Sequence, residues 1–327
     1  MTDCRKCSAP VDPAHRFCES CGAVQAEVSQ VAVPRPGRAA DQPCAECGSA
    51  EFTDDYCATC GHRRPEPDRD ELALGEVYLI TDRGIHHAGN EDAAAAGIIE
   101  RAEGAARAAV VCDGVSSARD SANASTSASQ AAVSAILAAL SAGRPAEAAM
   151  VAGLTDAAKA AANAFTDQPT APSCTFTGAI VIPKDDGGVD ITVGNVGDSR
   201  TYWLPLPPNE SQQLTLDDSL ARELIAAGVA ADSEAVLRGE HTLTRWLGAD
   251  ADPQPWSANA VKTVSVRGPG TVLVCSDGLW NYLPEAADLA ARCAGVDVTT
   301  AARALVDFAN QSGGQDNITV VLVPIGG

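Results

Sequence analysis

The stretch Arg107–Gly114, Arg-Ala-Ala-Val-Val-Cys-Asp-Gly, carries the pattern on which the interpretation of the chain depends. A short apolar run that stops at a turn residue is typical of a buried strand. The same pattern returns in Thr271–Gly278, Thr-Val-Leu-Val-Cys-Ser-Asp-Gly. Asp113 and Asp277 then stand at strand ends, each held by a rigid element yet open to solvent. Two such carboxylates suggest a site for Mg²⁺ or Mn²⁺, which prefer oxygen ligands, and two ordinary Asp-Gly turns are the alternative.

Composition restricts the class of protein. The 327 residues, 46% of them hydrophobic, suffice for one large domain and a small one. A formal net charge of −20 argues against nucleic-acid partners and against anionic membranes, both of which require a basic surface. No apolar run approaches the ~20 residues of a membrane span. The N-terminus is polar and rich in cysteine, unlike a signal peptide, so we expect a cytoplasmic protein.

Cysteine spacing predicts two zinc sites near the N-terminus. In a reducing compartment, cysteines indicate metal binding rather than disulfides. Eight of the twelve form four Cys-x2-Cys pairs, namely Cys4 with Cys7, Cys18 with Cys21, Cys44 with Cys47, and Cys57 with Cys60. Two neighbouring pairs supply the four thiolates of a tetrahedral zinc site, and redox-active dithiols would not explain the doubled spacing. Residues 1–64 resemble the double zinc ribbon family.

The ribbon region is not basic. Residues 1–65 hold seven Lys and Arg against nine Asp and Glu, so a docking or regulatory role is favoured over nucleic-acid binding. The stretches Val31–Pro43 and Arg63–Glu71, Pro-rich and charged respectively, are typical of linkers. We therefore expect a double zinc ribbon over 1–64, a linker over 65–75 and one large domain over 76–327.

Further acidic residues flank predicted strands in the large domain. Glu91 and Asp92 come after the predicted strand Val77–Thr81, although a solvated turn is the alternative for them. Asp316 comes just before a last predicted strand, Ile318–Val323. In the sequence between Asp92 and Asp316, three apolar runs predict consecutive strands of an antiparallel meander, at Cys174–Ile182, Val189–Gly194 and Arg200–Leu204.

Six blocks in order make the large domain resemble the metal-dependent serine/threonine protein phosphatases of type 2C. They are Asn90-Glu91-Asp92, Asp113-Gly114, Gly197-Asp198-Ser199-Arg200, Thr244-Arg245-x-Leu247-Gly248, Ser276-Asp277-Gly278-Leu279 and Gly314-x-Asp316-Asn317-Ile318-Thr319. The resemblance implies an α+β fold: a four-layer α/β/β/α sandwich of two antiparallel sheets, here preceded by the two small zinc ribbons. It also places a metal centre in a cleft at one edge of the sandwich.

The resemblance further implies the ligands of two Mn²⁺ or Mg²⁺ ions. Asp113 would bridge them, the Gly114 carbonyl and the Glu91-Asp92 pair would complete the shell of one, and Asp277 and Asp316 would hold the other. A third, weaker ion is also consistent with the family. Two such ions can lower the pKa of a bridging water and bind the phosphoryl oxygens, so phosphoserine or phosphothreonine would be hydrolysed without a protein nucleophile.

One departure concerns the phosphate contact. Many relatives have Arg four residues before the position of Glu91, where this chain has His87, so phosphate binding is expected to be weaker or pH-dependent. The expected partners are phosphorylated proteins of a serine/threonine kinase pathway, with neither nucleic acid nor membrane, and the chain is expected to be a monomer. The alternatives are a pseudophosphatase that binds phosphoproteins without turnover and a zinc-ribbon nucleic-acid protein, which the charge disfavours.

Overall fold

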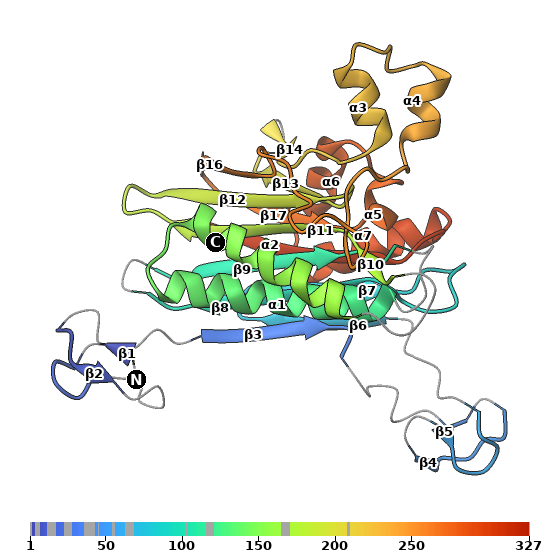
Figure 1. The fold of residues 1–327 in the computed structure, drawn as a ribbon, viewed down its shortest axis with the longest axis horizontal. Helices are drawn as coiled ribbons and strands as arrows, with labels where there is room; N and C mark the ends of the chain where they lie inside the picture. Colours follow the sequence, from blue (N-terminus) through green and yellow to red (C-terminus); the bar gives the residue numbers. More distant parts are fainter. Residues whose placement is uncertain are drawn as a thin grey trace.

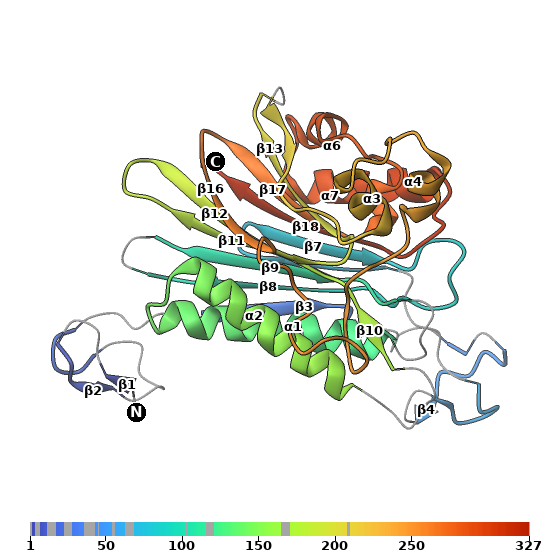
Figure 2. The ribbon, with the colours of Figure 1, turned by 45° about the horizontal axis from the view of Figure 1, so that its top comes forward.

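Two six-stranded sheets stack face to face in the large domain of this computed structural model, with helices on both outer faces (Figures 1 and 2). The structure describes residues 2–3, 7–11, 18–22, 28–35, 43–44, 46–53, 56–62, 69–101, 104–115, 121–164, 171–207 and 210–326. In order across the first sheet, the strands are β16 (Val261–Arg267), β12 (Gly188–Val196), β11 (Phe176–Pro183), β9 (Ala106–Cys112), β8 (Ala93–Ile99) and β3 (Val28–Val33). Across the second, they are β14 (Gln212–Gln213), β13 (Arg200–Pro205), β17 (Gly270–Cys275), β18 (Ile318–Ile325), β7 (Val77–Asp82) and β6 (Arg69–Leu74).

Two pairs of helices complete the four layers. The pair α1 (Ser121–Ser141) and α2 (Ala146–Asn163) covers the first sheet, and α6 (Ala286–Cys293) with α7 (Val298–Gln311) covers the second (Figure 2). Small residues allow α1 to pack closely on the first sheet: a Cβ on Gly97 of β8 would lie 2.4 Å from Leu137 Cδ1. The predicted α+β sandwich is therefore confirmed.

Strand β9 shows why its sequence is apolar throughout. Successive side chains of a strand point to opposite faces. Ala108, Val110 and Cys112 pack in the cluster beneath α1 and α2, whereas Ala109 and Val111 pack in the cluster between the two sheets. Because both faces of the strand are buried, the run lacks the polar alternation of a half-exposed strand.

The predicted meander is wrong at its third strand. β11 and β12 pair as a hairpin in the first sheet, but β13 pairs with β17 in the second. The chain crosses between the sheets at Gly197, whose φ of +98° is readily adopted only by glycine, and a Cβ there would lie 2.8 Å from Thr175 Cγ2. Strand runs separated by a short turn look alike in sequence whether or not they share a sheet.

The predicted linkers also differ from the structure, because part of each is a strand. β3 pairs with β8 and forms one edge of the first sheet, and β6 pairs with β7 and forms one edge of the second. Both edge strands come from residues outside 76–327. Arg35 joins the two strands: its backbone N–H and its guanidinium donate to the buried Asp70 carboxylate at distances down to 2.6 Å. The sheet edges recruit these segments through backbone hydrogen bonds, which composition does not reveal.

The remaining elements are small. Two-stranded hairpins β1 (Thr2–Asp3) with β2 (Pro10–Val11), and β4 (Phe52–Thr53) with β5 (Tyr56–Cys57), lie at opposite ends of the large domain (Figure 1). The other short elements are β10 (Ser173–Cys174) paired with β15 (Leu247–Gly248), α5 (Asp277–Trp280), α3 (Leu220–Ala226) and α4 (Glu234–Gly239). We call residues 214–241, which carry α3 and α4 and project from the sandwich, the flap. Among the helices within the described ranges, none has the length and apolar character needed to cross a bilayer.

Candidate active site

Asp113 and Gly114 lie just past the end of β9, where the chain leaves the first sheet. The Asp113 N–H donates to Thr175 Oγ1 (3.1 Å), and its carbonyl accepts from the Thr175 N–H (2.8 Å). Gly114 makes an isolated β-bridge with Cys174. A Cβ on Gly114 would lie 2.7 Å from the Glu91 carbonyl oxygen, so the absence of a side chain lets the loop that carries Glu91 approach.

Glu91 and Asp92 lie in the loop that approaches Gly114, and hydrogen bonds fix both residues. The Glu91 N–H donates to Asn317 Oδ1 (2.7 Å), and its carbonyl accepts a hydrogen bond from Ser125 Oγ. Asp92 is 1% exposed, and its Oδ2 accepts from Ser276 Oγ (2.7 Å), whereas its Oδ1 is buried with no hydrogen-bond partner. Such an oxygen is costly unless a cation or a proton satisfies it.

Asp277 and Asp316 come from the second sheet. Asp277 opens α5 instead of closing β17; its Oδ2 accepts from Asn281 Nδ2 (3.1 Å), and its Oδ1 is buried without a partner. Asp316 precedes β18, and its Oδ1 accepts from the Asn317 N–H at 2.8 Å. The same Oδ1 lies 3.2 Å from His87 Nε2. The structure therefore brings the ends of β9, β17 and β18 together at one edge of the sandwich, with their acids in one cluster.

The acids of this cluster perturb one another strongly. Burial, followed by the charges of Asp92 and Asp277, raises the pKa of Asp113 well above its usual range. Burial is also the main cause that raises the pKa of Asp92 to about 7 and that of Asp277 to about 6, with neighbouring carboxylates adding to both. Asp198 has a pKa raised to about 8 by burial and then by the charge of Asp277. Divalent cations would relieve both the repulsion and the unpaired oxygens, so the residues fit such ions.

Asp198 is the member of the cluster that the sequence did not single out as a ligand. Its block, Gly197-Asp198-Ser199-Arg200, looked like a hairpin turn, and only the crossing between the sheets carries Asp198 to Asp277. Over the described residues, no three of the acids bring one carboxylate oxygen each within 4.8 Å of one another. Cations held by this cluster would accordingly use water molecules for part of their coordination shells.

His87, the predicted phosphate contact, lies at this cluster but faces Asp316. A second basic side chain, not predicted from the sequence as part of the site, comes from the same loop: the Arg83 guanidinium donates to the His87 carbonyl oxygen. Asn317 Nδ2 holds the loop by donating to the carbonyls of Arg83 (2.7 Å) and Gly89 (3.1 Å). The available signal for Arg83 was a cationic residue directly after a strand, in a loop with two histidines.

A groove of about 880 Å³ opens beside the acids, between the flap and the end of the sandwich. Asp316 and Trp280 line it, together with Ile225 and Val236 from the flap. Arg200 packs over the Trp280 ring at 3.6 Å from the centroid. The groove combines apolar and polar walls and leads to the cluster.

The cysteine pairs come together as predicted in the parts that the structure describes. The sulfurs of Cys44, Cys47, Cys57 and Cys60 lie within 4.8 Å of one another, as do those of Cys7, Cys18 and Cys21. Cys4 lies outside the described residues. Both groups have the donor type and spacing of a tetrahedral zinc site.

Comparison with known proteins agrees with this geometry. The family profile described as Protein phosphatase 2C matches residues 85–309. The serine/threonine phosphatase stp of Listeria welshimeri is 35% identical over 136 residues, which are 41% of this chain and 51% of that protein. The chain thus spans about half the length of the curated relatives it matches.

Solved structures extend the likeness to about three quarters of the chain. The PPM Ser-Thr phosphatase MsPP from Mycobacterium smegmatis, in complex with cacodylate, is 28% identical, with a TM-score of 0.57 over 78% of this chain and 100% of that one. The catalytic domain of the phosphatase PstP, in complex with two manganese ions, shares the fold at 24% identity and a TM-score of 0.51, over 76% of this chain and 98% of that one.

Proposed function

The chain belongs to the protein phosphatase 2C family, and from that premise we propose that it is a protein phosphatase that hydrolyses phosphoserine and phosphothreonine in proteins with the help of divalent cations. The observation that carries the proposal is the cluster of carboxylates at one edge of the sandwich. Two of its buried oxygens, Asp92 Oδ1 and Asp277 Oδ1, have no hydrogen-bond partner. Carboxylates crowded in this way have no evident role in folding, but they suit cation binding.

The proposed ligands are those that the family resemblance implies, and the electrostatics of the acids support them. Asp113, whose pKa is raised by burial and then by the charges of Asp92 and Asp277, would bridge two ions. Glu91, Asp92 and the Gly114 carbonyl would serve one ion, and Asp277 and Asp316 the other. Bound Mn²⁺ or Mg²⁺ would lower the pKa of a bridging water and neutralise phosphoryl oxygens. The PstP structure, which shares the fold, was solved with two manganese ions, and this supports the proposal of two divalent cations.

The chain's own groups position these ligands and the substrate. Ser276 and Asn317 orient Asp92 and the Glu91 backbone through the hydrogen bonds described above. His87 lies beside Asp316, where its Nε2 can donate to a phosphate oxygen or to the carboxylate. The groove beside the flap would take the peptide on either side of the phosphorylated residue.

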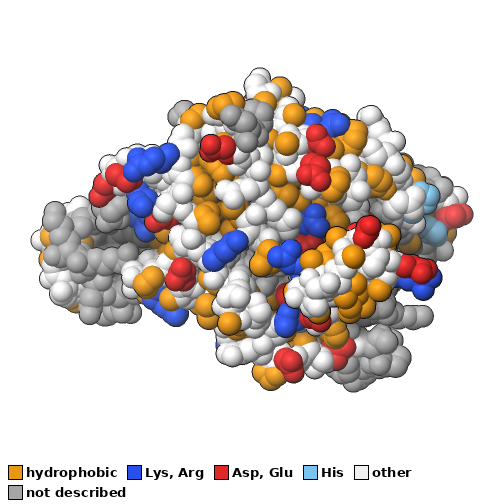
Figure 3. All heavy atoms as spheres, turned by 90° about the horizontal axis from the view of Figure 1, so that it is seen from above, with side chains coloured by type: hydrophobic (Ala, Val, Ile, Leu, Met, Phe, Trp, Pro, Cys, Tyr) orange, Lys and Arg blue, Asp and Glu red, His pale blue; other side chains and the backbone are white. Residues whose placement is uncertain are grey.

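The two cysteine groups are proposed to hold structural zinc, and the ribbons to serve docking or regulation. Both groups bring sulfurs together in modules too small to fold on apolar burial alone. Acidic and basic side chains are interspersed on the face of the molecule shown in Figure 3, which offers no continuous basic surface for nucleic acid. The adaptor alternative without turnover has no observation in its favour, since every proposed ligand of the divalent cations is present.

The test is hydrolysis of phosphoserine and phosphothreonine peptides by the full chain. Activity should require added Mn²⁺ or Mg²⁺ and disappear with EDTA. It should resist reagents that block serine or cysteine nucleophiles. Stoichiometric binding of phosphopeptides without Mn²⁺-dependent hydrolysis would contradict the proposal and favour the adaptor.

A further inference from the structure

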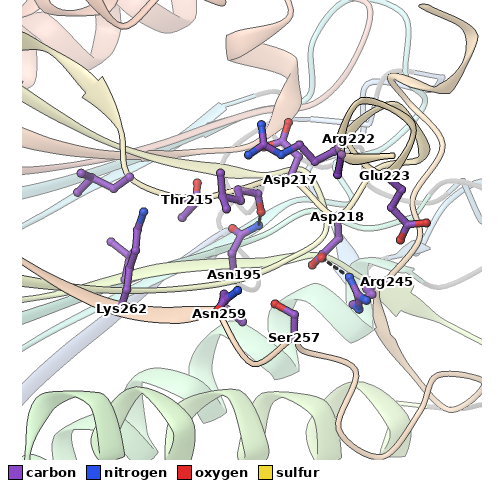
Figure 4. A pocket seen from close by; sticks show the side chains of 15 residues that line it. Asn195, Thr215, Asp217, Asp218, Arg222, Glu223, Arg245, Ser257, Asn259 and Lys262 are labelled. Carbon is purple, nitrogen blue, oxygen red and sulfur yellow. Dashed lines mark hydrogen bonds and ion pairs between the residues drawn. The ribbon is translucent and has the colours of Figure 1, made fainter. Parts of the chain in front are cut away.

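A second, smaller cavity lies away from the acid cluster, between the edge of the first sheet and α3 (Figure 4). Its volume is about 180 Å³, and its floor includes the buried residues Val193 and Leu214. The segment 215–217 lines both this cavity and the groove, so it forms a wall that the two share. A volume of this size holds a small ion with a few water molecules, but no folded partner.

The charges around the cavity favour an anion. Three cationic side chains line it, Arg222, Arg245 and Lys262. Among the described residues, no carboxylate lies within ion-pair distance of Lys262 or Arg222.

The acids that line the cavity are engaged or turned away. Asp217 is held by Arg200 at 2.7 Å and Asp218 by Arg245 at 2.6 Å. The third, Glu223, points its carboxylate away from Asn195 and Lys262 in Figure 4. Lys262 and Arg222 therefore remain available to a negatively charged ligand, whereas Arg245 would have to share its guanidinium with Asp218 or leave it.

The buried side chain of Asn195 requires that a ligand also carry a hydrogen-bond donor. This residue is 3% exposed and lines the cavity from the end of β12. Its Nδ2 donates to the carbonyls of Gly197 (2.9 Å) and Leu216 (3.1 Å), which fixes the orientation of the amide. Its Oδ1 is buried and has no hydrogen-bond partner. A ligand that satisfies this oxygen must carry an N–H or O–H group.

We propose that this cavity is a binding site for inorganic phosphate. Hydrogenphosphate combines the two requirements, because its anionic oxygens can accept from Lys262 and Arg245 while its O–H donates to Asn195 Oδ1. Sulfate has similar size and charge but carries no proton near neutral pH, so it cannot make the last bond. Phosphate is also the product of the proposed reaction, so binding in this cavity would let the product inhibit the enzyme.

The hydrogen bonds of Asp218 connect this cavity to the acid cluster and so suggest how bound phosphate would inhibit turnover. Its Oδ1 accepts from Arg245, and its Oδ2 accepts from the Gly197 N–H at 3.2 Å, next to Asp198 of the acid cluster. An anion that draws Arg245 away from Asp218 would weaken the hydrogen bonds that hold the chain at Gly197, where it crosses between the two sheets. Phosphate bound here is therefore expected to slow turnover without competing with substrate, a consequence that rests on the proposed function.

The test measures binding without catalysis. The full chain, with no added Mn²⁺ or Mg²⁺, is titrated with phosphate at constant ionic strength, and the rise in Tm gives the Kd. Without these cations the acid cluster repels anions, so it contributes no competing site. Lys262→Gln should weaken phosphate binding about tenfold, Lys262→Arg should largely restore it, and the exposed Lys159→Gln should leave it unchanged.

Two comparisons complete the experiment. Sulfate should bind more weakly than phosphate to the wild type, and free phosphoserine, a monoester with a larger group to accommodate, should also bind more weakly than phosphate. The proposal is overturned if Lys262→Gln binds phosphate as the wild type does, or if sulfate binds as tightly as phosphate. Tighter binding of phosphoserine would instead make the ligand a phosphorylated side chain and also overturn it. None of these results depends on whether the protein hydrolyses phosphopeptides.

Discussion

His87 stands where the family resemblance implies an arginine, and its Nε2 lies 3.2 Å from Asp316 Oδ1. His87→Arg should lower KM for a phosphopeptide several-fold at pH 8, because arginine stays charged where an ordinary histidine is neutral. The measurement is KM and kcat at pH 8 and pH 6. The neighbouring His86 is exposed, so His86→Arg is the matched control and should leave KM unchanged. An unchanged or higher KM for His87→Arg would show that this position does not contact phosphate.

The acid cluster predicts how stability depends on pH when the divalent cations are withheld. The folded-state pKa values of Asp92, about 7, and Asp277, about 6, lie above the ~3.9 of an unfolded aspartate. Between the unfolded-state and folded-state pKa values, the folded protein binds more protons than the unfolded one. Its stability is therefore greatest at low pH and falls as the pH rises through the folded-state pKa values. From these two groups we expect a loss on the order of 4 kcal/mol between pH 5 and pH 8.

Chemical denaturation at several pH values checks this expectation. Added Mn²⁺ should reverse the loss at pH 8, because the cation replaces the protons. Asp92→Asn should reduce the pH dependence, since it removes one of the raised groups. Stability that rises from pH 5 to pH 8 without cations would contradict the assignment.

At the scale of elements, β3 and Arg35 make the N-terminal region part of the sandwich. Removal of residues 1–27 should leave the Tm of the large domain within a few degrees of the wild type. Removal of residues 1–68 also deletes β3 and leaves the Asp70 carboxylate, 1% exposed, without Arg35. An unpaired buried charge costs about 3 kcal/mol or more, so this deletion should lower Tm markedly. Equal Tm values for the two deletions would show that β3 adds nothing.

The elements also show what could be predicted from sequence. Long apolar runs such as β9, β17 and β18 were predicted because burial on both faces leaves a plain signal. β3 was missed because a strand at a sheet edge owes its conformation to pairing with β8, which lies more than sixty residues away. The acids at strand ends were predicted individually, whereas Asp198 was not, because its place in the cluster depends on β13 joining the second sheet.

At the scale of the whole molecule, two kinds of metal support separate parts of the chain. Chelation that removes zinc should unfold both cysteine modules, since metal binding supplies their folding energy. The sandwich should stay folded, because its core of buried apolar residues contains none of the eight paired cysteines. Metal analysis of the purified protein should find two zinc ions per chain, and protein without zinc would contradict the ribbon assignment. Near-ultraviolet circular dichroism before and after chelation would follow the sandwich.

The central claim is that the acid cluster activates water through divalent cations, and Asp113 tests it most directly. The measurement is kcat for a phosphothreonine peptide with saturating Mn²⁺, comparing the wild type, Asp113→Asn and the exposed control Asp156→Asn. An amide of the same size carries no charge, so Asp113→Asn should lose about 10³-fold or more in kcat, roughly 4 kcal/mol of transition-state stabilisation. The fold should be unchanged and the control fully active. Near-normal turnover by Asp113→Asn would show that Asp113 does not bridge the ions, and the mechanism proposed here would be contradicted.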